Sequence, residues 1–457
     1  MKNITQALAA TLLIAATVAN AQESPKVFGR TIAPERINPT TGQIRCVSSE
    51  YEKHLQEINP NRATEAQFEE WLAEKMEAVK TRRGTSTTAT VVTIPVVVHV
   101  IHNETSVGVN ENIADGQVLS QITVLNQDYR KMINTPGYNT NPVGADMEIQ
   151  FALAQVDPSG NATNGIHRVY YSRSSWSETQ VETIMKPQTS WDPTRYFNIW
   201  VCNFGGDLDG VLGYAQFPST SGLGGLNSNE GASNTDGVII GYQYFGSEAL
   251  YPQGTYDSTY NGGRTATHEI GHCFGLRHVD GDNTSCTVNA TDSYKDYCPD
   301  TPAIKELNYD CVTIDSCPSA TGSDMIENYM DYTPDSCMNV FTQNQKGRML
   351  TVLQNSINRA SLTTSTVWQS LGTAQNTLLS GISVYPNPAA DVLNISVPGG
   401  ALIDSYSIAN SLGQTIAGAK VSSATQLSIN TSSLSNGIYF IKLTKGGEVK
   451  TIKFVKN

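Results

Sequence analysis

The stretch HEIGHCFGLRH, residues 268–278, decides how this chain builds its functional centre. If it is helical, His268 and His272 lie one turn apart on the same face, so both imidazoles can reach one metal ion. Glu269 points away from that face and can hold a water beside the ion. The spacing therefore predicts a metal-binding helix that carries its own general base.

The second half of the stretch predicts a sharp turn and a third ligand. Gly275 can adopt a left-handed conformation, which ends a helix and redirects the chain. His278 can then return to the same ion. Three protein ligands leave the fourth position of a tetrahedral zinc ion open, which is typical of a catalytic site. Ordinary surface or core histidines would not require this spacing.

Composition limits the class of protein. The chain has 457 residues, a length that suggests two or three domains. It is 39% hydrophobic and 16% charged, with a formal net charge of −12 and no basic block. These values favour globular domains and argue against nucleic acid as a partner.

The N-terminus has the pattern of a secretory signal peptide over residues 1–21. Lys2 supplies the positive start, residues 7–18 form a short apolar core, and Ala19-Asn20-Ala21 is a small-x-small cleavage site. The apolar run is too short to span a membrane. The sequence therefore predicts an exported protein whose mature form is soluble, and export makes disulfides plausible among its eight cysteines.

Residues 22–90 are expected to form a pro-segment. Residues 51–80 are rich in Glu and Lys and show helical spacing of their apolar residues. Arg82-Arg83 precedes a Gly/Ser/Thr stretch and is the expected processing site.

Residues 91–357 are expected to form the catalytic domain. The β-branched run 93–101 predicts a buried first strand. The domain should continue with a helix within 111–133, strands at 147–156 and 197–202, an edge strand at 210–218, the metal-binding helix and a closing helix at 341–357. An edge strand could pair with an extended substrate.

The rest of the chain is expected to be a linker, 358–380, and a small β-domain, 381–457. Short alternating strands separated by Gly and Pro turns predict an Ig-like β-sandwich of roughly seven strands.

A second motif follows the metal-binding stretch after about fifty residues. It is Asn328-Tyr329-Met330-Asp331-Tyr332. Met330 is suited to packing beneath the histidines because its side chain is soft and unbranched. Tyr332 can donate its phenol to an oxyanion.

Together the two motifs resemble those of the metzincin peptidases, H-E-x-x-H-x-x-G-x-x-H followed by a Met-turn. The catalytic segment resembles the pappalysin branch in particular, through its entry strand from Ile94 to His102, Leu212 to Pro218, Asp300-Thr301-Pro302, and Cys337 to Thr342. The resemblance implies an α/β (α+β) metzincin fold with an upper twisted sheet, a loop-rich lower subdomain, a helical pro-segment, and zinc-dependent endopeptidase activity.

The same resemblance implies two disulfides, Cys286–Cys317 and Cys311–Cys337. Cys298 is an additional cysteine against that pattern. For Cys202 and Cys273, buried thiols and a mutual pair remain open alternatives.

Two further residues have expected roles. Cys46 is the lone cysteine of the pro-segment and is expected to fill the open zinc position until the segment is removed; the alternative is a disulfide with another cysteine. Asp335 follows the Met-turn, in the segment that lines the pocket for the residue after the scissile bond in this family. A carboxylate there would favour Arg or Lys, and a solvated loop aspartate is the alternative.

Asp296 and Thr301 are expected to bind calcium, partly from their family position; polar loop capping is the alternative. The C-terminal domain resembles type A sorting domains of the type IX secretion system through Val384-Tyr385-Pro386-Asn387-Pro388 and Asn436-Gly437-Ile438-Tyr439. It implies export across an outer membrane by that machinery, with a wall-binding sandwich as the alternative.

The sequence thus predicts a secreted zinc endopeptidase made as a latent zymogen and monomeric when mature. It would cleave proteins or peptides, with Glu269 as general base. Two other classes compete with this interpretation, an adhesion module with structural zinc and a cell-wall amidase. An intact Glu269 argues against the first, and the long edge strand argues against the second.

Overall fold

The computed structural model describes residues 24–83, 91–218, 233–286, 296–370, 379, 382–396, 403–421, 426–445 and 448–457. The expected signal peptide and the linker after Arg83 lie outside this part of the chain. The chain divides into two compact units, residues 1–369 and 370–457, which are described separately. Within the described residues, none of the helices combines the length and apolar character needed to cross a membrane.

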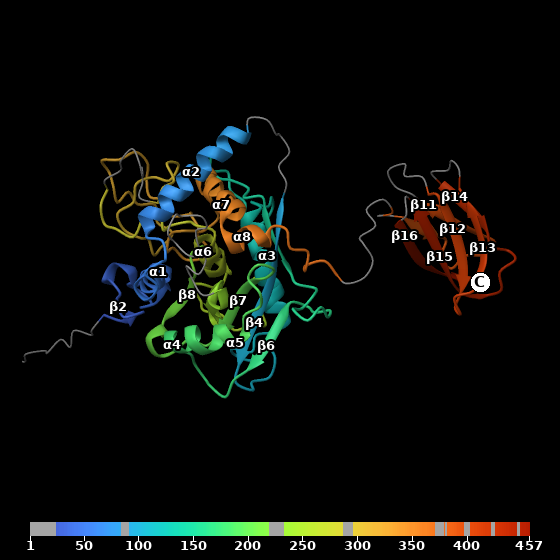
Figure 1. The fold of residues 1–457 in the computed structure, drawn as a ribbon, viewed down its shortest axis with the longest axis horizontal. Helices are drawn as coiled ribbons and strands as arrows, with labels where there is room; N and C mark the ends of the chain where they lie inside the picture. The colour runs from blue at the N-terminus through green and yellow to red at the C-terminus, as the bar shows by residue number, and fades with distance from the viewer. Residues whose placement is uncertain are drawn as a thin grey trace, which may run out of the picture. The chain divides into compact units, whose positions relative to one another are not determined.

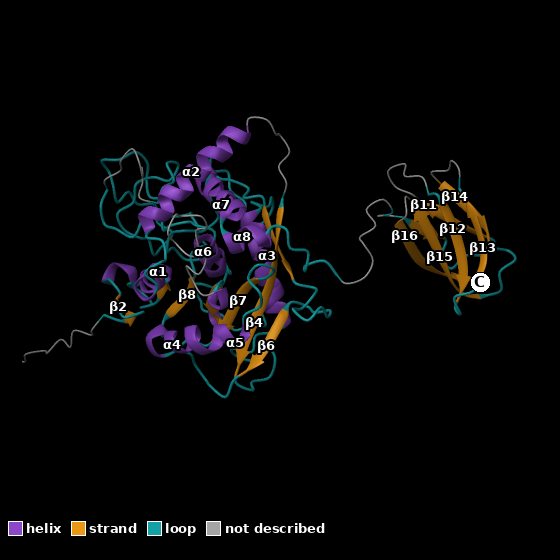
Figure 2. Ribbon diagram, viewed as in Figure 1, coloured by secondary structure: helices purple, strands orange, loops and turns teal. Residues whose placement is uncertain are grey.

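A seven-stranded sheet forms the centre of the first unit (Figures 1 and 2). Its order is β3-β8-β9-β7-β4-β5, and β6 also pairs with β4. All pairs are parallel except β8 with β9. The bounds are β3 (Ile44–Cys46), β4 (Val92–His102), β5 (Ile149–Leu153), β6 (Ile166–Tyr170), β7 (Phe197–Cys202), β8 (Val211–Ala215) and β9 (Val238–Gly241).

Three longer helices build the main core of this unit. They are α3 (Asp115–Tyr129), α6 (Arg264–Cys273) and α7 (Gln343–Asn355). Their apolar residues join those of β4, β5, β7 and β9 in one buried cluster. The β-branched run that predicted a first strand is β4, whose interior is almost wholly buried because both faces of the sheet are covered.

The remaining helices of the catalytic segment are short. They are α4 (Glu178–Gln180), the π-helix η2 (Val181–Met185), α5 (Lys186–Thr189), η3 (Gly206–Leu208), η4 (Ser233–Thr235), η5 (Tyr242–Tyr244) and α8 (Ile357–Leu362). Because α8 is helical, the expected linker at 358–380 begins later than the sequence indicated. The expected closing helix is likewise split between α7 and α8 by Ser356, which has extended backbone angles.

The segment predicted to be a pro-segment, described over residues 24–83 and called the pro-segment below, is folded against the sheet. It contains β1 (Lys26–Val27), β2 (Arg30–Thr31), η1 (Pro34–Arg36), β3, α1 (Ser48–Ile58) and α2 (Glu65–Arg83). The helical pattern expected over 51–80 is interrupted between α1 and α2, where Pro60 cannot continue a helix. Phe28, Val47 and Tyr51 join a second buried cluster with Trp200 and Tyr214 of the sheet.

The segment between α6 and α7 is a set of loops held by disulfides. No helix or strand is assigned between Phe274 and Gln343 in the residues described there. Bonds join Cys286 to Cys317 and Cys311 to Cys337, as the family resemblance implied. Cys202 and Cys273 are separate buried thiols, as are Cys46 and Cys298.

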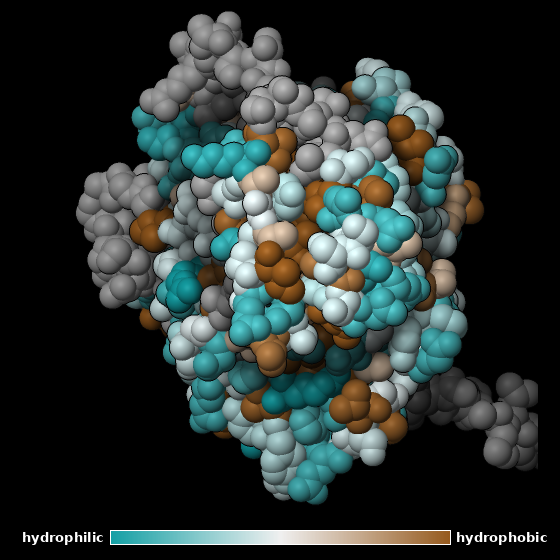
Figure 3. Space-filling view, turned by 90° about the vertical axis from the view of Figure 1, so that its right-hand side faces the viewer, coloured by the Kyte–Doolittle hydropathy of each residue, from teal (hydrophilic) through white to brown (hydrophobic). Residues whose placement is uncertain are grey.

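The second unit consists of two antiparallel sheets, one of β10-β11-β14 and one of β13-β12-β15-β16. Residues from both sheets, such as Leu393 and Ile441, share one buried core. The bounds are β10 (Ser383–Tyr385), β11 (Val392–Ser396), β12 (Ser405–Asn410), β13 (Thr415–Lys420), β14 (Gln426–Asn430), β15 (Gly437–Lys445) and β16 (Glu448–Lys456). Figure 3 shows one face of the molecule, on which hydrophobic residues are scattered among hydrophilic ones.

Candidate active site

Helix α6 carries the first half of the metal-binding stretch, and glycines shape its surroundings. Gly275 has φ +89°, so the expected left-handed turn is present and the chain reverses toward His278. Gly271 lies against Met330, because a Cβ added there would fall 2.6 Å from Sδ. The Met-turn therefore packs directly beneath the helix, and this packing needs a residue without a side chain.

The three histidines converge through their Nε2 atoms. The Nε2 atom of His272 lies 3.1 Å from that of His268 and 3.0 Å from that of His278. All three side chains are fully buried. Ligands that each stand about 2.0–2.1 Å from one zinc ion lie roughly 3 Å or slightly more from one another. The spacing therefore suits a shared ion.

The opposite ring atoms fix the tautomers. The Nδ1 atoms of His268 and His272 lie 2.7 and 2.9 Å from the carbonyl oxygens of Tyr329 and Leu276. Nδ1 of His278 lies 2.7 Å from Oδ1 of Asp282. With Nδ1–H donating to these acceptors, three Nε2 lone pairs face one another, an arrangement that a cation stabilises.

Electrostatics favour neutral imidazoles at this site. Burial, together with the neighbouring histidines, holds the pKa of His268 and that of His272 well below 6.5. Neutral imidazole is the form that binds metal. These residues therefore fit zinc in donor type, protonation and number.

Glu269 lies beside this cluster and is completely buried. Its Oε2 accepts a hydrogen bond from the Ser48 hydroxyl at 2.7 Å and lies 3.4 Å from the Cys46 sulfur. Its Oε1 has no hydrogen-bond partner within the described protein. Burial raises the pKa of this carboxyl to about 8 despite those two contacts. An unpaired carboxylate oxygen beside a metal site can accept a proton from water.

Tyr332 reaches the same centre from the Met-turn. Its hydroxyl lies 3.4 Å from Nε2 of His278 and donates to the carbonyl of Cys46 at 3.1 Å. The same oxygen accepts from Arg36 at 2.6 Å. Burial raises the pKa of Tyr332 well above 10, which keeps the phenol protonated. In this state the pro-segment occupies both hydrogen-bonding directions of the phenol.

The pro-segment enters the cleft as strand β3, parallel to β8, with Cys46 opposite Gly213. Cys46 Sγ and the three histidines form one group whose ligand atoms all lie within 4.8 Å of one another. The structure thus brings together the four residues that the sequence assigned to zinc and its latent-state ligand. It also excludes the alternative disulfide, because Cys46 is a free thiol.

Asp335 is 2% exposed, so it is not a solvated loop residue while Arg45 covers it. Its Oδ1 lies 3.2 Å from Nη2 of Arg45, and its Oδ2 accepts from the backbone N–H groups of Gly262 and Arg264. The Arg45 side chain is also fully buried. Arg45, the residue before Cys46, therefore places its guanidinium on the carboxylate of Asp335.

Several contributors were missed by the sequence reasoning. Asp282 holds His278, and in turn it binds Arg36 and accepts from the Ser49 hydroxyl at 2.6 Å. Ser48 holds Glu269. The pattern Arg45-Cys46-x-Ser48 was visible, but nothing in the sequence showed that this segment runs along β8.

A second contact region ties α2 to the far end of the metal-binding stretch. Glu69 accepts from Arg348 at 2.7 and 2.8 Å and from Arg277 at 3.2 Å. Arg348 also donates to the carbonyl of Gly275 at 2.9 Å. Burial opposes the charge on Glu69, but these guanidinium groups outweigh it and lower its pKa below 4.5.

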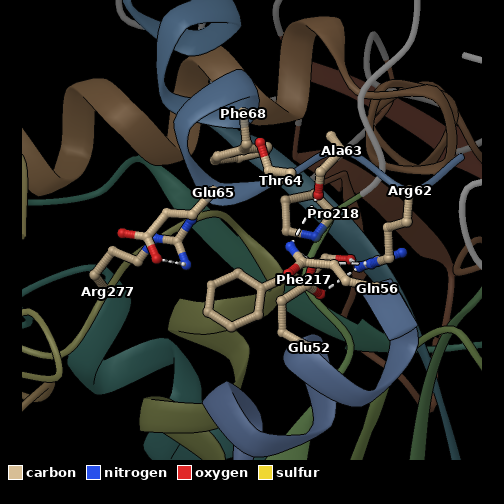
Figure 4. A pocket seen from close by; sticks show the side chains of 10 residues that line it. All are labelled: Glu52, Gln56, Arg62, Ala63, Thr64, Glu65, Phe68, Phe217, Pro218 and Arg277. Atoms are coloured by element: carbon tan, nitrogen blue, oxygen red, sulfur yellow. Dashed lines mark hydrogen bonds and ion pairs between the residues drawn. The ribbon is translucent and has the colours of Figure 1, made fainter. Parts of the chain in front are cut away.

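A small pocket lies beside this contact region, between both pro-segment helices and the end of β8. Figure 4 shows Arg277 facing Glu65 at one end of the pocket and Arg62 facing Glu52 at the other. Arg62 also donates to the carbonyl of Phe217 at 3.1 Å.

The expected calcium ligands lie next to each other. The Thr301 hydroxyl donates to Asp296 at 2.8 Å, and the Cys298 N–H donates to the same carboxylate at 3.0 Å. Burial raises the pKa of Asp296 well above 3.8.

Comparison with known proteins agrees with this geometry. Residues 179–354 match the family described as pregnancy-associated plasma protein-A, a peptidase family, and residues 383–457 match the secretion system C-terminal sorting domain. Extracellular metalloproteases of Sordaria macrospora and Neurospora crassa are each 32% identical over 279 residues, which cover 61% of this chain and 80% of theirs.

Solved structures give the same assignment. Mature mirolysin of Tannerella forsythia, in complex with a cleaved peptide, is 39% identical with a TM-score of 0.50, covering 61% of this chain and 97% of that one. A promirolysin mutant from the same organism is 35% identical with a TM-score of 0.53, covering 70% and 96%. The buried histidine cluster, the Met-turn and these similarities together lead to one conclusion. The chain belongs to the pappalysin family of metzincin metalloendopeptidases and carries a C-terminal type IX sorting domain for secretion.

Proposed function

We propose that this secreted metalloprotease hydrolyses peptide bonds with Glu269 as the proton-transfer group. The observation that carries the proposal is the unpaired Oε1 of a buried carboxylate beside three converging Nε2 atoms. His268, His272 and His278 would hold the zinc ion, which supplies Lewis-acid polarisation when bound. Glu269 accepts a proton from the attacking water and delivers it to the departing amine.

Tyr332 would stabilise the developing oxyanion once the pro-segment leaves. Its protonated phenol is freed from Arg36 and the Cys46 carbonyl at that point, so the hydroxyl can donate to the substrate oxygen. Met330 supports the histidines from below. The buried carboxylate of Glu269 argues against the adhesion alternative. The similarity to metalloproteases argues against the amidase alternative.

Casein cleavage by the purified, activated protein tests this function. Glu269→Ala is expected to reduce the rate at least about 100-fold, because general-base catalysis is worth roughly 10²–10⁴. Glu306→Ala, at an exposed position of the catalytic segment, is the matched control for handling and folding. A folded Glu269→Ala protein that cleaves casein at the parental rate would disprove the assignment.

Asp335 would select Arg or Lys after the scissile bond. The support comes from Arg45, whose buried guanidinium already lies 3.2 Å from this carboxylate. Peptide-library profiling should show a basic preference at that position. Asp335→Asn should reduce this preference, because it removes the charge and keeps the shape. A wild-type profile without a basic preference would refute the role.

Latency would depend on Cys46 as the fourth zinc ligand, with cleavage near Arg82-Arg83 beginning activation. α2 ends at Arg83, so the dibasic pair lies at the C-terminal end of this helix. Cys46→Ala should give premature casein-cleaving activity, while Cys202→Ala, at a buried free thiol away from the zinc cluster, should not. Unchanged latency in Cys46→Ala would contradict this switch.

Three further assignments complete the proposal. Asp296 and Thr301 would contribute to a calcium site, since their side-chain oxygens are buried and lie 2.8 Å apart. A melting temperature indifferent to calcium chelation would exclude that site. The two C-terminal sheets would form the Ig-like sandwich that the outer-membrane machinery recognises, and the mature enzyme would be a monomer by sedimentation.

A further inference from the structure

The side chain of Tyr51 fills a slot that belongs to the catalytic part of the chain. The residue lies on α1, five positions after Cys46, and is 1% exposed. Its ring centroid lies 5.0 Å from Lys186 Nζ and 5.2 Å from the ring of Tyr214. Its hydroxyl donates to Oε2 of Glu182. The slot thus combines aromatic walls with a single carboxylate acceptor.

Apart from the ring of Phe28, the walls of this slot belong to the catalytic segment and contact one another. Oε1 of Glu182 accepts from the Tyr214 hydroxyl at 2.7 Å and pairs with Lys186 at 2.6 Å. Lys186 is fully buried and also lies against the rings of Tyr214 and Trp200. Removal of the pro-segment takes away the phenol together with Phe28, whose ring lies 4.8 Å from that of Tyr51, but leaves Glu182, Lys186 and Tyr214 in place.

We propose that in the activated enzyme this slot is a substrate subsite that accepts a tyrosine side chain. Oε2 of Glu182 then loses its donor, and the Gln216 amide oxygen, 3.5 Å from the same hydroxyl, is a second acceptor at this place, so a donor is favoured here. A phenol supplies both the ring and the donor. An aliphatic side chain supplies neither the donor nor a flat face for Lys186 and Tyr214.

The pro-segment also indicates which substrate residue would enter the slot. Arg45, before Cys46, lies on Asp335, which the proposed function assigns to the residue after the scissile bond. Tyr51 lies on the other side of Cys46, toward the C-terminal end of β8, and therefore corresponds to the part of a substrate before the scissile bond. Val47 is not extended and α1 begins at Ser48, so the chain advances at most roughly 11 Å from Cys46 to Tyr51, which no more than about three to four extended residues would span.

The inference rests on the proposed endopeptidase activity, and its test separates the two. A host peptide cleaved by the wild-type activated enzyme is resynthesised with alanine, phenylalanine, tyrosine or O-methyltyrosine at each position from the second to the fifth residue before the scissile bond. If no host peptide is cleaved at all, the proposed function itself is wrong.

At one of these positions tyrosine should raise kcat/KM about tenfold over alanine, because it adds ring burial and a hydrogen bond to a charged acceptor. Phenylalanine should give an intermediate value. O-methyltyrosine, which keeps the ring but cannot donate, should fall to the phenylalanine value or below. Values for all four residues within twofold of one another at every position would overturn the proposal, as would equal values for tyrosine and O-methyltyrosine.

Discussion

The docking of α2 through Glu69 allows a quantitative prediction about latency. Glu69→Ala removes the partner of Arg348, whose side chain is 2% exposed, and of Arg277, whose side chain is 8% exposed. Two bonds of 2.7 and 2.8 Å to Arg348 and one of 3.2 Å to Arg277 are lost together. Among the described residues, Arg348 then has no ion-pair partner while α2 remains docked, and Arg277 keeps only the 3.8 Å contact with Glu65.

The expected loss of docking free energy follows from the burial of these guanidinium groups. Breaking a buried ion pair from one side costs about 3–5 kcal/mol, since the remaining charge stays desolvated. In the undocked state both arginines are solvated, so nearly the whole cost falls on the docked state. Even the lower figure of about 3 kcal/mol enlarges the undocked population roughly 100-fold.

Hydrogen exchange along α2 measures this population directly. The experiment uses the full chain carrying Glu269→Ala, which prevents self-cleavage. With Glu69→Ala added, the α2 amides should exchange about 100-fold faster. Glu70→Ala, at the adjacent exposed position, should leave them unchanged. Less than a threefold acceleration would show that the ion pair does not hold the helix and would refute the reasoning.

Acid should weaken the same contact. The pKa of Glu69 in the folded protein lies below its ordinary value of 4.5. The stabilisation that Glu69 contributes is therefore complete above about pH 4.5 and is lost as the pH falls through the folded pKa. In that pH window, hydrogen exchange of the α2 amides, corrected for the intrinsic rate, should become faster. Gly271→Ala should lower the melting temperature of the zymogen and the activity of the mature enzyme, because the new Cβ would lie 2.6 Å from Met330 Sδ. Such overpacking costs about 1–3 kcal/mol of stability. An unchanged activity would contradict the packing argument. Asp236→Ala should destabilise the first unit by about 3–5 kcal/mol in calorimetry, since it leaves buried Arg359 unpaired, and a change below 1 kcal/mol would argue against the pair. A zinc chelator should abolish casein cleavage, and added zinc should restore it.

Much of the fold could be predicted because local sequence patterns specify individual helices and strands. The β-branched run of β4 and the histidine spacing of α6 each specify one element, and both elements are present. The first and last residues of these elements were predicted less accurately than their presence. The strand expected at 147–156 is only Ile149–Leu153, and the closing helix is broken at Ser356. Ends of elements depend on capping and on neighbours, which a sequence pattern does not show.

The sequence by itself determined the chemistry of the centre. Three imidazoles and a carboxylate in HEIGHCFGLRH are separated by a helical turn and a glycine, and such short-range geometry follows from backbone rules alone. The Met-turn and the C-terminal sorting domain were likewise readable from local motifs.

Only the tertiary structure decided how the predicted pro-segment contacts this centre. Three contacts join residues that are more than two hundred positions apart in the sequence. They are Ser48 with Glu269, Arg36 with Tyr332 and Arg45 with Asp335. These contacts exist because β3 pairs with β8 and carries the segment through the cleft. Strand pairing between distant segments is set by the burial of whole faces, which no local pattern specifies.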